Sequence, residues 1–279
     1  MSAVRSLQFD EVKLVTGSMD RTIRVWNWRM GTCLRVLEGH TEGVVCVNFD
    51  ADLLASGSVD TTIKIWDFRN GGMFTLWGHT DWVNCVQLWD TRSGEISSPH
   101  TPARAQFGAS PSSAIANLDW TPAEHQSTTS PDINCGKMLF SASDDGTIRL
   151  WDLSSRTCVR TFTGHVGQVQ TLKLSYMERL LSECKTSASK DDRDIEIPST
   201  SSQTADDTLS PDPGPVLISG SLDNTIKTWD IHTGKAVKTF FGHIEGVWSV
   251  AADKMRLISG SHDRTIKASS LPLSSWMKD

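Results

Sequence analysis

Short apolar runs recur along the chain and are separated by small and polar turn residues. Clear examples are CLRVL (33–37), GVVCVNF (43–49), LLASGS (53–58) and TIKIW (62–66). Their length and their content of β-branched residues are typical of strands rather than helices. Asp60 and Thr61 fall between two of these runs and suit a tight turn. The pattern therefore predicts an all-β chain of many short strands.

The runs belong to a longer internal repeat. Gly-His occurs at 39–40, 78–79, 164–165 and 242–243, and Trp-Asp at 66–67, 151–152 and 229–230, with Trp26-Asn27 as a near match. Between these marks lies a small-residue cluster that ends in Asp and precedes Thr-Ile or a close relative. Its five copies are TGSMD (16–20), SGSVD (56–60), SASDD (141–145), SGSLD (219–223) and SGSHD (259–263).

The spacing of the marks places the copies in one register. Trp66 lies 26 residues after His40, and the same step back from Trp26 ends just before Met1. The same step forward from His243 reaches Ser269, where Trp is missing. We therefore expect residue 1 to fall inside one repeat and the last copy to be incomplete.

Two repeats are stretched by insertions at 91–134 and 176–214, between their first and second strands. Eight of the ten prolines lie in these insertions and a ninth, Pro215, directly follows the second; both insertions are also rich in Ser and Thr. Such segments bury too little apolar area to offset the entropy of ordering, so we expect both to be disordered. The cost of closing a loop grows slowly with its length, so the strands can tolerate them.

The five copies resemble WD40 repeats. The resemblance implies an all-β, WD40 β-propeller fragment over residues 1–279, with four to five four-stranded blades. It also implies a hydrogen-bonded His-Ser-Asp-Trp tetrad in each complete blade. The implied tetrads are His40, Ser56, Asp60 and Trp66; His79, Ser141, Asp145 and Trp151; and His165, Ser219, Asp223 and Trp229. Because fewer blades are present than a ring of seven or eight needs, we expect an open arc.

Composition narrows the function. There are 27 Lys and Arg against 33 Asp and Glu, a net charge of −6, and no basic run, which argues against direct binding of nucleic acid. No apolar window is long enough to span a membrane, and the start lacks a secretory signal. Cys33 and Cys158 share one repeat column, and Cys46 and Cys85 another. We expect them to be small core residues, free of disulfides, in a cytoplasmic or nuclear protein.

Catalytic chemistry is not expected. Ser, His and Asp together suggest a hydrolase triad, but they recur in every repeat, whereas a catalytic set would occur once. The sequence holds no Cys-x-x-Cys or His-x-x-x-His pair, so neither a metal site nor a cofactor is expected. One basic column could hold an acidic partner, or its aliphatic stems could simply cover apolar surface. It comprises Arg24, Lys64, Arg149, Lys227 and Lys267.

Columns that differ between repeats are candidates for partner contact. Three of them lie near the tetrads: the position before the first strand, the second position of that strand, and the position after the conserved Asp. Trp and Arg are enriched at binding hot spots. The candidate set is Arg5, Arg21, Trp82, Asn84, Gln168, Gln170, Trp248 and Arg264. For Trp82 and Trp248 the alternative is that each fills a gap between blades.

Several segments are similar to the fungal sulfur-controller F-box/WD-repeat proteins. They are GHTDWVNCV (78–86), GHVGQVQ (164–170), LDNTIKTWD (222–230) and FGHIEGVWSVAADKMRLISGSHDRTIK (241–267). The resemblance implies a substrate receptor of an SCF-type E3 ubiquitin ligase, with a bZIP-type activator of sulfur assimilation as its protein partner. We expect no F-box before residue 1, and therefore no contact of this chain with the ligase adaptor. A general WD40 scaffold and a non-functional fragment remain the alternatives.

Overall fold

A computed structural model describes residues 2–92, 133, 135–175, 215–253 and 256–270. These residues form strands and no helix, and hence no helix that could cross a membrane. The strands are β1 (Val4–Phe9), β2 (Leu14–Ser18), β3 (Ile23–Asn27), β4 (Thr32–Leu37), β5 (Val44–Phe49), β6 (Leu53–Ser58), β7 (Ile63–Asp67), β8 (Met73–Leu76), β9 (Val83–Asp90), β10 (Lys137–Ser143), β11 (Ile148–Asp152), β12 (Thr157–Phe162), β13 (Val169–Ser175), β14 (Val216–Ser221), β15 (Ile226–Trp229), β16 (Ala236–Phe240), β17 (Val247–Ala252), β18 (Arg256–Ser261) and β19 (Ile266–Ser270).

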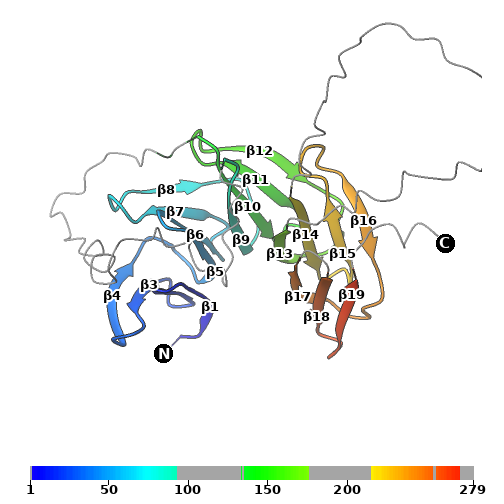
Figure 1. The fold of residues 1–279 in the computed structure, drawn as a ribbon, viewed down its shortest axis with the longest axis horizontal. Helices are drawn as coiled ribbons and strands as arrows, with labels where there is room; N and C mark the ends of the chain where they lie inside the picture. The colour runs from blue at the N-terminus through cyan, green and yellow to red at the C-terminus, as the bar shows by residue number, and fades with distance from the viewer. Residues whose placement is uncertain (1, 93–132, 134, 176–214, 254–255, 271–279) are drawn as a thin grey trace, which may run out of the picture.

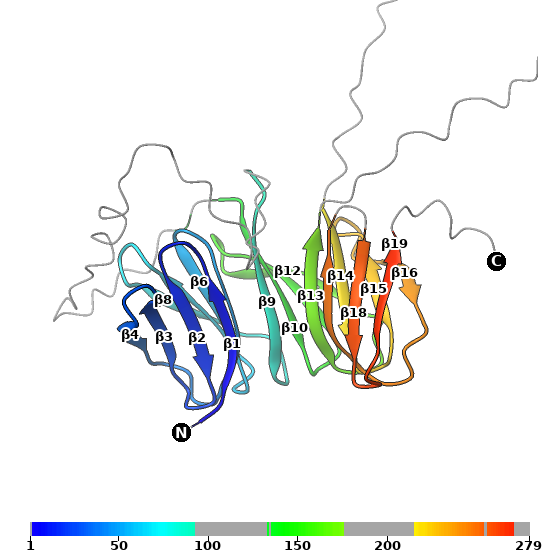
Figure 2. The ribbon, with the colours of Figure 1, turned by 60° about the horizontal axis from the view of Figure 1, so that its bottom comes forward.

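The strands form five antiparallel sheets, each built from strands that follow one another in the chain. Blades 1 to 4 are β1–β4, β5–β8, β9–β12 and β13–β16, and blade 5 is the three-stranded sheet β17–β19. We call the strands of a blade a, b, c and d in chain order. The blades follow one another round an arc, with blades 1 and 5 at its two ends (Figures 1 and 2). The predicted partial, open WD40 propeller is confirmed.

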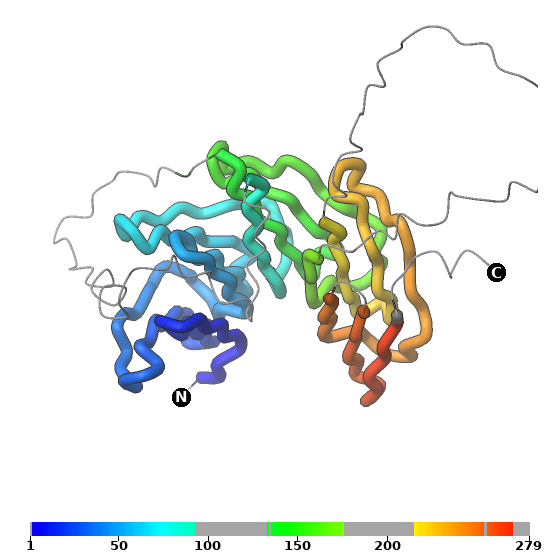
Figure 3. Tube along the Cα trace, in the orientation of Figure 1, coloured from blue at the N-terminus to red at the C-terminus, as the bar shows by residue number. Residues whose placement is uncertain are grey.

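Strand a of each blade lies on the inner side of the arc, and strand d of the four-stranded blades on the outer side (Figure 3). The two insertions fall between strands a and b, in blades 3 and 4. They lie almost entirely outside the described residues, so the expectation of disorder is not tested. Ile133, at the end of the first insertion, is described and is buried in an apolar cluster. Beside it, the backbone N–H of Thr91 donates to the carbonyl of Gly136.

The hydrophobic core lies between the blades. Each of the four apolar clusters joins two successive blades; one, for example, packs Val15 and Ile23 of blade 1 against Val47 and Phe49 of blade 2. Strands such as β5 and β6 are buried along their whole length because a blade covers each face. Burial of this kind is the main stabilising contribution here, because no helix covers the sheets in the described part of the chain.

Buried carboxamides join strand a of one blade to strand a of the next. The Gln8 carboxamide donates to the Phe49 carbonyl at 2.9 Å and accepts from the Phe49 N–H at 2.8 Å. Asn48 accepts from the Leu88 N–H at 2.7 Å, and Gln87 from the Leu174 N–H at 2.8 Å. We call this series the amide clasp. It fixes the register between blades, because each buried backbone group receives one specific partner.

The cysteines correct one expectation. Cys46 is buried and Cys85 packs partly buried against a core cluster, as expected. Cys33 and Cys158, however, are exposed, so their prediction as core residues is wrong. Both lie on strand d, whose position at the outer edge of the blade leaves most of its side chains in solvent. All five described cysteines are free.

Candidate protein-binding face

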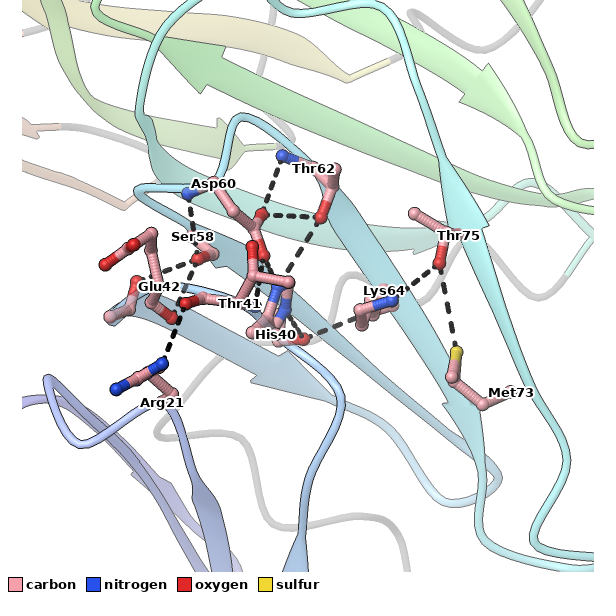
Figure 4. A network of polar contacts seen from close by, with 12 residues as sticks. Arg21, His40, Thr41, Glu42, Ser58, Asp60, Thr62, Lys64, Met73 and Thr75 are labelled. Atoms are coloured by element: carbon pink, nitrogen blue, oxygen red, sulfur yellow. Dashed lines mark hydrogen bonds and ion pairs between the residues drawn. The ribbon is translucent and has the colours of Figure 1, made fainter.

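Four side chains of blade 2 form a complete tetrad, in which His40 and Trp66 converge on Ser56 (Figure 4 shows the His and the Asp). His40 Nδ1 lies 2.8 Å from Asp60 Oδ2, and His40 Nε2 lies 2.9 Å from Ser56 Oγ. Trp66 Nε1 donates to the same Ser56 Oγ at 3.0 Å. Because a carboxylate only accepts, His40 Nδ1 carries a proton and donates to Asp60. The hydrogen bond between Nε2 and the Ser56 hydroxyl holds the other side of the ring.

The same geometry recurs in blades 3 and 4. In blade 3, His79 reaches Asp145 and Ser141 at 2.7 Å, and Trp151 donates to Ser141 at 2.8 Å. Blade 4 repeats these distances with His165, Asp223, Ser219 and Trp229. All twelve residues of the implied tetrads are thus brought together in their expected groups.

The two end blades hold parts of a tetrad. In blade 5, His243 lies 2.8 Å from Asp263 and 2.9 Å from Ser259, and Ser269 stands where the tryptophan would be. In blade 1, Trp26 donates to Thr16 Oγ1 at 2.9 Å. The sequence analysis did not name these partial networks, although the repeat register contains them.

A threonine that the sequence analysis did not single out completes each network. Thr62 donates to Asp60 Oδ1 through its hydroxyl at 2.6 Å and its N–H at 3.0 Å (Figure 4). Burial alone would raise the pKa of Asp60, but the hydrogen bonds from His40 and Thr62 outweigh it and hold that pKa well below its usual range. Asp145 is held in the same way by His79 and Thr147. The sequence signal that could have identified this threonine is the Thr-Ile pair that begins two residues after each conserved Asp.

The position after the conserved Asp is a left-handed turn in every blade. The φ angles lie between 64° and 77° for Arg21, Thr61, Gly146, Asn224 and Arg264. Only Gly and, less strongly, Asn adopt this conformation readily. The sequence analysis treated this column as free to vary, but its backbone is constrained in all five blades. Arg21 and Arg264 are exposed at this turn.

These networks tie the loop before strand a to the turn between strands b and c. Both lie at the same end of the blade, and we call the surface they form the tetrad face. All eight candidate partner residues lie on or beside it. Trp82 and Trp248 are 41% and 47% exposed, so each presents part of its side chain to solvent. Arg5 and Gln168 are also exposed.

Three of the eight candidates meet around one residue that the sequence analysis missed, Asp144. Asn84 and Gln170 both donate to Asp144 Oδ1, the second at 2.9 Å, and the Asp144 N–H donates to the Trp82 carbonyl. Burial raises the pKa of Asp144, despite the lowering effect of the two carboxamides. The pairs Arg5 and Arg21, and Trp248 and Arg264, instead lie in the end blades 1 and 5. The eight residues therefore span the arc and do not form one cluster.

Two members of the basic column, Lys64 and Lys227, contact strand d of their own blade. Lys64 Nζ donates to Thr75 Oγ1 at 2.8 Å, and Lys227 Nζ to Thr239 Oγ1 at 2.9 Å (Figure 4 for Lys64). The Arg149 guanidinium lies over the Trp151 ring, 5.9 Å from its centre. Lys267 Nζ donates to the carbonyl oxygen of Gly242. Arg24 Nη2 lies 3.7 Å from Asp20 Oδ2. Across the described chain, no group of three His, Cys, Asp or Glu side chains could hold a metal ion.

Radial four-stranded blades, with a core between them and a repeated His-Ser-Asp-Trp network, define a propeller-type repeat protein. The comparison with family models agrees. The chain belongs to the WD40 family (WD domain, G-beta repeat), whose model matches residues 2–27, 31–67, 112–152, 207–230 and 234–268.

Similar proteins include an F-box protein and subunits of ubiquitin ligases. The chain is 38% identical over 201 residues to an F-box protein of Saccharomyces cerevisiae, covering 68% of this chain and 24% of that protein. It is 40% identical over 207 residues to the probable E3 ubiquitin ligase complex SCF subunit sconB of Emericella nidulans, covering 67% and 24%. The sconB of Talaromyces stipitatus is 36% identical over 137 residues, covering 46% and 20%. The chain thus spans about a quarter of the length of these relatives or less.

Proposed function

We propose that this chain is the substrate-binding part of a receptor of an SCF-type E3 ubiquitin ligase. The observation that carries the proposal is its similarity, at 36–40% identity, to a yeast F-box protein and to probable SCF subunits. The chain would act as a non-catalytic adaptor whose partners are proteins, in the cytoplasm or nucleus. The resemblance to sulfur-controller proteins extends the proposal to a bZIP-type activator of sulfur assimilation as the substrate.

The tetrad face suits this role physically. Its backbone is held by buried hydrogen bonds in each blade, so little conformational entropy is lost when a partner binds. Its exposed side chains differ from blade to blade, which allows one partner to be distinguished from another. Trp82 and Trp248 offer large, partly exposed aromatic surfaces, which are frequent anchors of protein interfaces.

The test measures binding between the purified chain and a bZIP-type activator of sulfur assimilation by isothermal titration calorimetry. We expect Trp82→Ala and Trp248→Ala each to weaken binding by about tenfold, the effect of losing a hot-spot residue. Trp28→Ala is the matched control. Trp28 is 46% exposed, nearly the same as Trp248, but it lies after strand c at the opposite end of its blade.

Two results would contradict the proposal. Absence of binding to the activator would remove the sulfur-control role and favour a general scaffold. Equal loss of affinity in all three variants, or loss only with Trp28→Ala, would move the binding site away from the tetrad face.

A further inference from the structure

The four contacts between blades are built from the same two half-surfaces. The first half-surface comes from strands b and c of one blade, for example Val15 and Ile23 of blade 1. The second comes mainly from strand a of the next blade, for example Val47 and Phe49 of blade 2. Every inner blade carries both half-surfaces, one on each side. The two end blades each have one half-surface without a partner blade in the described structure.

Blade 1 exposes the second half-surface. Leu7 occupies the column of Val47 but is 57% exposed, against 7% for Val47. Phe9 occupies the column of Phe49 and is also exposed, whereas Phe49 is buried. Both residues pair in register with β2, and no described blade covers their side chains.

Blade 5 exposes the first half-surface. Ile266 is 79% exposed, although its counterparts in all four preceding blades, Ile226 among them, are buried. Ile258 is exposed where Ile218 is fully buried. Gly260 has open space where a Cβ would be, whereas a Cβ at Gly220 would lie 2.7 Å from Val247 of the next blade. The space that receives a valine of the following blade is therefore present and empty.

The two ends are thus complementary halves of a contact that the chain makes four times internally. They lie at opposite ends of the arc, and no hydrogen-bonded ladder joins blade 1 to blade 5 among the described strands (Figure 2). One copy therefore does not join its own ends. We propose that a second copy of this chain binds there, with blade 5 of one copy packed against blade 1 of the next. This head-to-tail contact is heterologous, so each copy retains one free end.

The contact between copies is expected to be weaker than the contacts that join blades 1 to 4 within a copy. Blade 5 has Ala251 in the column of the amide clasp, where Gln8, Asn48 and Gln87 stand in blades 1 to 3. An alanine offers no side-chain acceptor to strand a of the incoming blade. Association should therefore depend on protein concentration, with apolar burial as its main driving force.

The test blocks one end at a time. Leu7→Glu places a charge on blade 1, and Ile266→Glu places one on blade 5; both side chains are exposed, so neither change should impair folding. Light scattering coupled to size-exclusion chromatography should show concentration-dependent oligomers of the unmodified chain and monomers of each variant. Mixing the two variants should give a 1:1 dimer, because one retains a free blade 5 and the other a free blade 1.

Val166→Glu is the control, since this exposed apolar residue lies on the tetrad face of an inner blade. It should leave the oligomers unchanged, and circular dichroism should show the same strand content in all variants. A monomeric unmodified chain at every concentration would overturn the proposal. So would oligomers that persist in both blocked variants, or a mixture that stays monomeric, because neither fits a contact between unlike ends.

Discussion

Each tetrad serine is the single residue through which a histidine and a tryptophan are satisfied together. In blade 4, Ser219 Oγ lies 2.7 Å from His165 Nε2 and accepts from Trp229 Nε1 at 2.8 Å, and all three side chains are buried. Removing the hydroxyl leaves two buried polar groups without a partner. An unsatisfied buried group costs about 1–3 kcal/mol.

We therefore expect Ser219→Ala to lower the free energy of unfolding by about 2 kcal/mol. Denaturant unfolding followed by tryptophan fluorescence measures the change. Ser155→Ala, at an exposed turn residue, is the control and should change stability by less than about 0.5 kcal/mol. Equal stability of the two variants would show that the network contributes specificity of structure rather than stability.

Acid should destabilise the protein. As pH falls, the first loss of stability is expected from His165. Burial lowers the pKa of His165, and the pairing with Asp223 offsets this only in part. The unfolded chain binds a proton at this residue near its ordinary pKa of about 6.5, whereas the folded chain does so only at lower pH. The unfolded state thus holds more protons, so the free energy of unfolding falls as pH drops through about 6.5 towards the folded pKa.

The tetrad carboxylates add a second loss at lower pH. The pKa values of Asp60 and Asp145 lie well below their usual range in the folded chain, so their contribution is complete above about pH 4 and is lost as pH falls further. Unfolding curves across this range should show both losses. A His165→Gln variant should flatten the curve near neutral pH, and His232→Gln, at an exposed turn, should not.

At the scale of the element, the close approach of neighbouring strands depends on glycine in strand b. A Cβ at Gly57 would lie 2.6 Å from both Cys46 Sγ and Val83 Cγ1, and the same column at Gly260 has nothing within 4 Å. Gly57→Ala should therefore cost about 1–3 kcal/mol through overpacking, and Gly260→Ala should cost little. Both variants carry the same change at the same position of strand b. Thermal unfolding compares their losses of stability.

The repeat register explains which parts of the structure could be predicted from the sequence alone. It predicted the blades and the tetrads, because His40, Ser56, Asp60 and Trp66 recur with fixed spacing in later repeats. It could not predict contacts between columns of different blades, such as Gln8 with Phe49 or Asn84 and Gln170 with Asp144. The exposure of Cys33 and the left-handed turn at Arg21 were missed for a related reason. Both depend on position within the folded blade, which residue type does not reveal.

At the scale of the whole molecule, stability is expected to vary along the arc. Chains of stacked repeats gain stability from each repeat and each contact with a neighbour. Blade 5 has one described neighbour, and the apolar cluster it shares with blade 4 has fewer buried residues than the other three. In blade 4, the clasp position that would reach strand a of blade 5 is Lys173 rather than a carboxamide.

Hydrogen exchange followed by mass spectrometry should show this gradient. Amides of β17–β19 should exchange faster than those of β5–β7 at a protein concentration low enough to prevent association. Blade 1 is the internal control, because it is also an end blade but is joined to blade 2 by Gln8. Uniform protection across all five blades would indicate that the arc unfolds as one cooperative unit.

Because the core lies between blades, the natural unit of this protein in evolution is one repeat, which carries half of a contact on each side. Duplicating such a unit in the gene adds a blade that can pack against both neighbours, and deleting one brings two compatible surfaces together. Neither event requires a new hydrophobic core, because the existing half-surfaces can pack against each other. The length of the arc can therefore change over generations while the apolar half-surfaces that form each contact are kept.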